Sequence, residues 1–177
     1  SELRTKALTS IVILLLLIAL YITWAFRKVS EPVPSWKYSI LTITAALHDI
    51  IIPLGVFAAL GAIFGWEIGI AFVAAMLTIL GYSINDTIVV FDRTRENLLK
   101  KTGEAFDKIV DKSIQQTFMR SVNTSVTTFL ALLAIFLWGG GTTRPFAFAL
   151  MVGIVVGTYS SLFLASPLLV AWEKWKN

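Results

Sequence analysis

Five long stretches of almost entirely apolar residues constrain the fold of this chain more than any other feature of its sequence. A helix needs about 20 consecutive apolar residues to cross the hydrocarbon layer of a membrane, because each residue advances it by about 1.5 Å. The core of a soluble protein does not need blocks of this length. The sequence therefore predicts an all-α membrane protein, in which a single transmembrane domain forms a bundle of five helices.

The predicted spans cover about residues 7–26, 37–64, 68–91, 117–138 and 145–172 of the 177-residue chain. A polar segment, about 92–116, separates the third span from the fourth. Within it, apolar residues recur at helical spacing, namely Phe106, Ile109, Val110 and Ile114. This pattern predicts a short amphipathic helix on the cytoplasmic side. The helix either lies on the membrane surface or is a solvated connector, and the sequence favours neither.

The composition limits the classes of function, since 56% of the residues are hydrophobic and only 15% are charged. The absence of cysteine excludes disulfides, zinc–thiolate sites and thiol nucleophiles. No phosphate-binding glycine loop is present, so we expect no nucleotide hydrolysis. We also expect no other enzymatic activity and no cofactor. The net charge of +4 comes from basic residues that flank the spans. Membrane topology explains such residues, so we expect contact with membrane lipid and no nucleic-acid partner.

The distribution of Lys and Arg predicts the orientation of the chain, because basic loops remain in the cytoplasm. Basic residues follow the first span, recur throughout the 92–116 segment and end the chain, whereas the other side carries only Arg4, Lys6 and Arg144. The N-terminus is therefore expected outside and the C-terminus in the cytoplasm. A chain that begins outside needs an upstream segment to carry its start across the membrane, so we interpret this chain as a fragment.

Asp86 is the first candidate functional residue, because it lies inside the third span, about five residues before Phe91 at its end. This spacing places its carboxyl group roughly 8 Å inside the apolar layer. An Asp in the centre of a membrane helix costs about 2.5–3.5 kcal/mol, and desolvation penalises its charged form. We therefore predict that Asp86 binds and releases protons. The alternative is a carboxylate that reaches the cytoplasmic headgroups or caps a kink.

A polar stripe follows one face of the fourth span. It consists of Arg120, Asn123, Thr124 and Thr127. Its expected counterpart on the third span consists of Thr78, Tyr82, Asn85 and Asp86. Polar groups in lipid must face protein or water, so we expect the two stripes to face each other and Arg120 to line a hydrated path with Asp86. Alternatively, Arg120 is an ordinary basic anchor at a helix end.

His48 and Asp49 lie within the second span and are secondary candidates. Adjacent residues do not share one helical face, so we expect them to contact different neighbours. Two interpretations remain open for this pair. It forms structural hydrogen bonds to the region of Asn85 and Asp86, or it belongs to a proton relay.

The end of the third span carries a recognisable motif. From Gly81 to Asn97 the chain reads GYSINDTIVVFDRTREN, which resembles the signature of the SecD/SecF family within the resistance–nodulation–division superfamily, with Thr94 where Ile is common. The Leu47-His48-Asp49 step, the polar stripe of the fourth span and the glycine-rich turn before the fifth span also match. The resemblance covers roughly residues 10–172.

This resemblance implies a subunit that works with SecD and the SecYEG translocon in the bacterial inner membrane. Members use the proton-motive force to assist the export of preproteins, and the family's key membrane residues match Asp86 and Arg120. The family has six helices with a periplasmic domain after the first. The chain would therefore contain helices two to six and lack the first helix and the periplasmic domain, which would contact the preprotein.

Two other functions remain open. One is a proton-coupled exporter of small molecules or lipids from the same superfamily. The other is a structural scaffold of the translocon that conducts no protons, and it predicts that Asn can replace Asp86 without loss of export.

Overall fold

The computed structural model describes residues 2–26, 33–65, 69–100, 103–141 and 143–175. They form the helices α1 (Glu2–Ala25), α2 (Ser35–Phe64), α3 (Ile70–Leu99), α4 (Phe106–Trp138), α5 (Thr143–Ser160) and α6 (Ser166–Lys174). A single π-helical turn, Ser161–Ala165, joins α5 to α6, so these two helices form one continuous rod. The described residues contain no strand, which agrees with the predicted all-α class.

Four of the rods are long and apolar enough to cross a membrane, namely α2, α3, α4 and the rod from α5 through α6. The fifth, α1, contains a shorter apolar stretch, Thr9–Ala25. In chain order these five rods correspond to the five predicted spans. The prediction of a five-helix membrane bundle is therefore confirmed.

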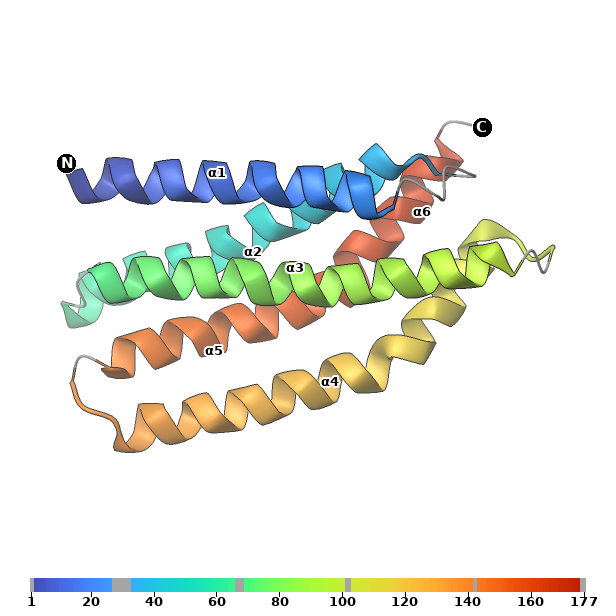
Figure 1. Ribbon diagram of the computed structural model, residues 1–177. Helices are drawn as coiled ribbons and strands as arrows, with labels where there is room; N and C mark the ends of the chain where they lie inside the picture. The colour runs from blue at the N-terminus through green and yellow to red at the C-terminus, as the bar shows by residue number, and fades with distance from the viewer. Residues whose placement is uncertain (1, 27–32, 66–68, 101–102, 142, 176–177) are drawn as a thin grey trace.

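The rods lie alongside one another and alternate in direction (Figure 1). One end of the bundle contains the N-terminus, the end of α2, the start of α3, the end of α4 and the start of α5. The opposite end contains the end of α1, the start of α2, the end of α3, the start of α4 and α6. The basic segments after the third and fifth spans thus share one end, as their charge predicted.

The predicted amphipathic helix exists, but it is not a separate element. Residues 106–116 form the first turns of α4. Ile109 and Val110 are buried there, and Val110 packs in one apolar cluster with Leu169 of α6. The apolar face of this segment therefore packs against the protein, so neither a membrane-surface helix nor a solvated connector describes it.

Glycines end two of the helices for steric reasons. Gly65 follows α2 with a left-handed φ of 68°, and its N–H donates to the Gly61 carbonyl at 3.0 Å; glycine adopts this conformation without a Cβ penalty. After α4, a Cβ on Gly139 would lie 2.3 Å from the Ile135 carbonyl oxygen. Residues 27–32 and 66–68, which contain most of the first two predicted loops, lie outside the described residues.

Close packing of α5 against α3 positions the polar residues of the bundle. The spacing of Gly153, Gly157 and Ser161 is typical of a close helix interface, and all three are buried. A Cβ on Gly153 would lie 2.3 Å from the Ile79 side chain, and one on Gly157 would lie 3.2 Å from the Ser83 Cβ. The absence of side chains at these two glycines allows the backbone of α5 to approach α3.

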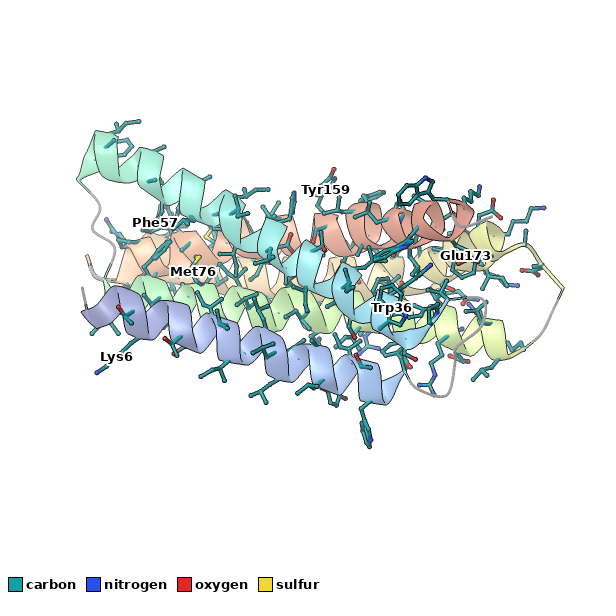
Figure 2. The ribbon with its side chains drawn as sticks, turned by 90° about the horizontal axis from the view of Figure 1, so that it is seen from above. Lys6, Trp36, Phe57, Met76, Tyr159 and Glu173 are labelled. Atoms are coloured by element: carbon teal, nitrogen blue, oxygen red, sulfur yellow. The ribbon has the colours of Figure 1, made fainter. Side chains whose placement is uncertain are left out.

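An apolar layer fills the end of the bundle nearer the N-terminus. Phe57 of α2 and Met76 of α3 belong to this layer, and Figure 2 shows them between the helices. Phe57 and Phe72 place their ring centroids 4.4 Å apart. The polar groups described below therefore begin where this apolar layer ends.

Candidate functional site

Asp86 lies on α3, and serines from two other rods hold its carboxylate. The hydroxyl of Ser121 on α4 donates to Oδ1 at 2.6 Å, and the hydroxyl of Ser161 in the π turn donates to Oδ2. Asp86 is half-buried, whereas both serines are buried. The carboxylate thus joins α3, α4 and the α5–α6 rod through hydrogen bonds to its two oxygens.

Asp49 on α2 forms a second site of the same construction. Its carboxylate is completely buried. Ser83 on α3 and Ser160 at the end of α5 both donate to Oδ2, the latter at 2.5 Å, and His48 Nδ1 lies 2.9 Å from Oδ1. Hydrogen bonds from three directions offset part of the cost of burying a charged group.

The neighbouring serines Ser160 and Ser161 bring the two carboxylates together. Ser160 binds Asp49 and Ser161 binds Asp86, so a single peptide unit separates the two contacts. On α3, Ser83 and Asp86 are three residues apart and lie on one face. The serines around Asp49 and those around Asp86 are therefore adjacent parts of one polar centre inside the bundle.

The π turn that contains Ser161 has a cause in the sequence. Pro167 lies near the start of α6; it has no N–H, and a proline ring inside a helix clashes with the carbonyl four residues earlier. The helix widens into the π turn directly before it, and Ser166 donates its hydroxyl to the Ser161 carbonyl at 3.1 Å. Such turns occur frequently at functional sites.

The predicted pairing of the two polar stripes is wrong. The four residues of the α4 stripe, Arg120, Asn123, Thr124 and Thr127, are all exposed. The residues of α4 that face the bundle are instead buried and recur every fourth position, namely Ser113, Thr117, Ser121 and Ser125. The two faces differ by one residue, a rotation of about 100°. Serine and threonine are preferred at close helix contacts because they are small.

The residues of the predicted α3 stripe differ in exposure, since some contact other helices and others face outward. Tyr82 is half-buried, and its hydroxyl lies 3.0 Å from that of Ser125, which in turn hydrogen-bonds Thr158. Asn85 and Thr78 are exposed. Thus Tyr82 and Asp86 lie at the contacts with α4 and α5, whereas Asn85 does not.

Arg120 lies apart from the carboxyl of Asp86. Among the described residues, it forms no ion pair with Asp86. It lines a cavity of about 520 Å³ at the end of α3, together with Asp92, Arg93 and Glu96. Since Ser121 is the next residue, a change in the position of this part of α4 would move both Arg120 and a donor to Asp86.

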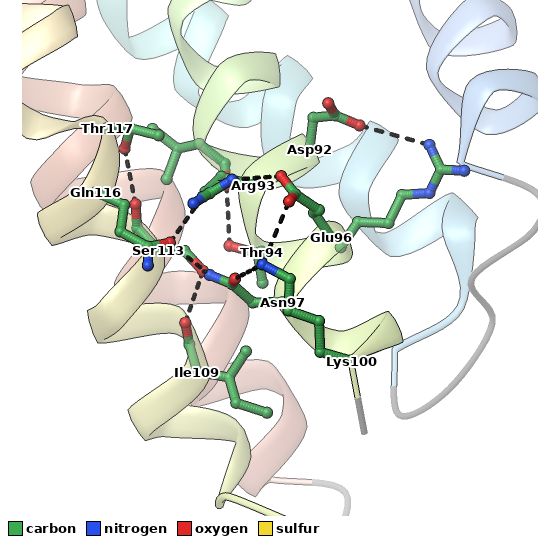
Figure 3. Close-up of polar contacts among 12 residues, drawn as sticks. Asp92, Arg93, Thr94, Glu96, Asn97, Lys100, Ile109, Ser113, Gln116 and Thr117 are labelled. Carbon is green, nitrogen blue, oxygen red and sulfur yellow. Dashed lines mark hydrogen bonds and ion pairs between the residues drawn. The ribbon is translucent and has the colours of Figure 1, made fainter. Parts of the chain in front are cut away.

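A network of charged and amide side chains fastens α3 to the first turns of α4 beside this cavity (Figure 3). Arg93 donates to Gln116 at 2.7 Å and pairs with Glu96. Asn97, which is buried, donates to Ser113 and Gln116, each at 2.9 Å. The described residues contain no group of three or more His, Cys, Asp or Glu side chains placed to hold a metal ion.

The four serines that hold the carboxylates were not predicted as site residues. Ser161 also belongs to the spacing of small residues at the contact of α5 with α3. A signal was nevertheless present on α4, since Ser113, Thr117, Ser121 and Ser125 repeat every four residues inside or beside a membrane span. Hydroxyls in such a repeat must face protein, and they form a stripe as regular as the one that begins at Arg120.

Comparisons with known proteins agree with the resemblance found in the sequence. The model of the family described as "Protein export membrane protein SecD/SecF, C-terminal" matches residues 1–175. The protein translocase subunit SecF of Thermobaculum terrenum is 52% identical over 97% of this chain and 53% of its own length. The protein translocase subunit SecDF of Thermus thermophilus is 43% identical over 97% of this chain and 22% of its own length.

Solved structures agree as well. The crystal structure of SecDF, a translocon-associated membrane protein from Thermus thermophilus, superposes with a TM-score of 0.86 at 44% identity, covering 98% of this chain and 22% of that one. SecDF in its super-membrane-facing form gives a TM-score of 0.85 at 41% identity. The chain spans about half the length of the SecF relatives it matches. It therefore belongs to the SecD/SecF family of protein export membrane proteins and corresponds to the family's C-terminal region.

Proposed function

We propose that this chain is the membrane part of a SecF-type subunit, which acts with a SecD-type partner beside the SecYEG channel. It uses the proton-motive force to assist preprotein export, with Asp86 as proton carrier. The observation that carries this proposal is the position of Asp86 inside a membrane bundle, between serine donors from two other rods. Family membership supports export, since its members are described as protein export membrane proteins.

Changes in the charge of Asp86 supply a way to move helices. When the carboxylate is charged, it accepts hydrogen bonds from Ser121 and Ser161. When a proton neutralises it, both charge-assisted bonds weaken, because bonds to an ionised group are roughly twice as strong as neutral ones. A coupling of about 1–3 kcal/mol shifts a two-state arrangement by a factor of about 5–150. Proton binding would thus change how α4 and the α5–α6 rod pack on α3.

Arg120 is proposed to act beside the carboxyl rather than paired with it. It lies on the exposed side of α4, next to Ser121 and beside the cavity at the end of α3. A fixed positive charge at this entrance would favour the ionised state of Asp86 and repel other cations. The exposed polar face of α4, with Asn123, Thr124 and Thr127, would face water or a partner rather than lipid.

We further propose that the chain lies in the bacterial inner membrane with the end that contains Lys100 in the cytoplasm. The basic segments at that end support this orientation. The complete protein would add the first helix and the periplasmic domain that contacts the preprotein.

The experiment is export of a preprotein into inverted membrane vesicles under an imposed proton gradient. We expect Asp86→Asn to assemble normally, since Asn retains the size and an acceptor oxygen, and to lose the stimulation by the gradient. Arg120→Ala should reduce that stimulation. Asp111→Asn is the matched control, because this carboxylate is exposed on α4 and, within the described part of the chain, bonds only Gln115. A full response of Asp86→Asn to the gradient would instead support the scaffold function.

A further inference from the structure

Asp49 is the only completely buried carboxyl among the described residues, and the function proposed above does not use it. It lies in a helix that crosses the apolar layer, where an acid is costly even when it is hydrogen-bonded. A neutral acceptor would join α2 to Ser83 and Ser160 without that cost. The acid at this position therefore points to a role in which its proton changes.

The serines between the two carboxyls are able to follow such a change. Ser160 Oγ lies 3.3 Å from the Gly157 carbonyl oxygen, and Ser161 Oγ lies 3.1 Å from that of Thr158. Each hydroxyl has one proton to donate and two lone pairs to accept with. If its carboxylate takes up a proton, the serine donates to the backbone carbonyl and accepts the carboxyl O–H. Each carboxyl and its serine therefore keep a hydrogen-bond partner in both states.

The other two serines lack this choice. Ser83 and Ser121 donate to the carboxylates, and among the described residues neither hydroxyl forms another hydrogen bond. The alternative acceptors thus belong to the two adjacent serines, one for each carboxyl. This arrangement distinguishes the Ser160–Ser161 pair from ordinary hydroxyls that fasten helices together.

The charged and titratable neighbours of Asp49 are few. On its own helix, His48 contacts it, and 33% of the His48 side chain is exposed, so His48 connects the buried acid with the outside of the bundle. From α3 the nearest acid is Asp86, three residues beyond Ser83. From α5, Ser160 and Gly157 approach Asp49, and neither is charged.

We propose that Asp49 is a second proton-binding carboxyl and that the Ser160–Ser161 pair links its protonation to that of Asp86. This inference rests on the proposed function in that Asp86 is taken as the proton carrier. Ionised carboxylates in one polar centre repel each other, because the effective dielectric constant there is about 20 rather than the 80 of water, and simultaneous ionisation is therefore disfavoured. A proton that leaves one carboxyl as another binds the second keeps the net charge of the pair constant.

The test is infrared spectroscopy of the assembled membrane complex during a pH titration, with the carbonyl stretch of protonated carboxyl groups as the signal. Asp49→Asn and Asp86→Asn assign the two bands by their loss. We expect both bands to titrate in the wild type. In each variant, the remaining carboxyl should lose its proton at a lower pH, because a neighbouring negative charge is absent. At the pH of wild-type half-protonation, its protonated-to-ionised ratio should fall by about fivefold or more, the range of a typical coupling between two sites.

Reciprocity supplies an internal check, because coupling between two sites has the same magnitude in both directions. Thr42→Ala is the matched control, since the only partner of this buried α2 hydroxyl in the described ranges is the Tyr38 carbonyl; it should leave both bands unchanged. If Asp49→Asn fails to assemble, the wild-type band that remains in Asp86→Asn still reports on Asp49.

Two results would overturn the inference: an Asp49 band that is absent or constant over the titration, or two bands that titrate without affecting each other. Neither result bears on the export assay, which tests Asp86 alone. Conversely, normal export by Asp86→Asn would refute the proposed function and leave the spectroscopic coupling to be judged separately.

Discussion

At the scale of single residues, serine hydroxyls hold both internal carboxyls, and among the described residues neither carboxyl forms an ion pair with Lys or Arg. A serine hydroxyl donates to a carboxylate and accepts from a carboxylic acid, so it partners either state. Arginine or lysine would stabilise only the charged state and hold the group ionised. The contacts of Ser121 and Ser161 with Asp86 therefore suit an acid that changes its charge.

Replacement of Ser121 by Ala tests this role. The variant removes the donor at 2.6 Å from Asp86 Oδ1. A hydrogen bond to a charged group contributes about 1.5–3 kcal/mol, so its loss weakens the link between α4 and the carboxylate on α3. We expect gradient-driven export to decrease. Thr128→Ala changes a hydroxyl on the same helix that, among the described residues, bonds only the Thr124 carbonyl, and it should leave export at the wild-type rate.

At the scale of helices, hydropathy predicted the spans well, because crossing a membrane imposes one length and one composition on every helix. It did not predict which side of a helix faces its neighbours. On α4 the stripe from Arg120 and the stripe through Ser121 are both polar. Tertiary packing determines which of them faces the bundle, because only the smaller side chains fit at a close helix contact. The π turn was likewise not predicted, although Pro167 marks its position, since a proline in a helix permits a kink, a break or a wider turn.

The interface between α3 and α5 gives a prediction at this scale. An Ala side chain at Gly153 would place its Cβ 2.3 Å from Ile79, a side chain that is only 1% exposed. Overpacking of this kind costs about 1–3 kcal/mol, so thermal unfolding in detergent should occur at a lower temperature. Gly55→Ala is the control, because apart from its own stretch of helix no described atom lies within 4 Å of the added Cβ. The double variant Gly153→Ala, Ile79→Ala should be more stable than the sum of the single changes predicts.

At the scale of the whole molecule, the helix directions place the basic segments at one end of the bundle and the glycine-rich turn at the other. The α3–α4 network in Figure 3 lies at the basic end. Asp86, Asp49 and their serines lie between this network and the apolar layer around Phe57. In the proposed orientation, a proton that reaches Asp86 from the outside would pass beside that layer, and one that leaves for the cytoplasm would pass the cavity beside Arg120.

Single-cysteine labelling tests the orientation of the molecule in a chain that contains no cysteine of its own. Lys100→Cys, at an exposed position beyond the end of α3, should react with a membrane-impermeant reagent only from the cytoplasmic side. Gly140→Cys, which is also exposed, should react only from the outside. Ala45→Cys, a completely buried position, should not react from either side. Labelling of Lys100→Cys from the outside alone would reverse the topology.

The central claim is that Asp86 carries protons, and proton entry into sealed vesicles that contain the purified complex tests it most directly. A pH-sensitive dye inside the vesicles reports the flux after a gradient is imposed. Wild type should acidify the interior, Asp86→Glu should do so more slowly because the carboxyl is displaced by one methylene, and Asp86→Asn should match vesicles without protein. Proton entry through Asp86→Asn at the wild-type rate would contradict the account.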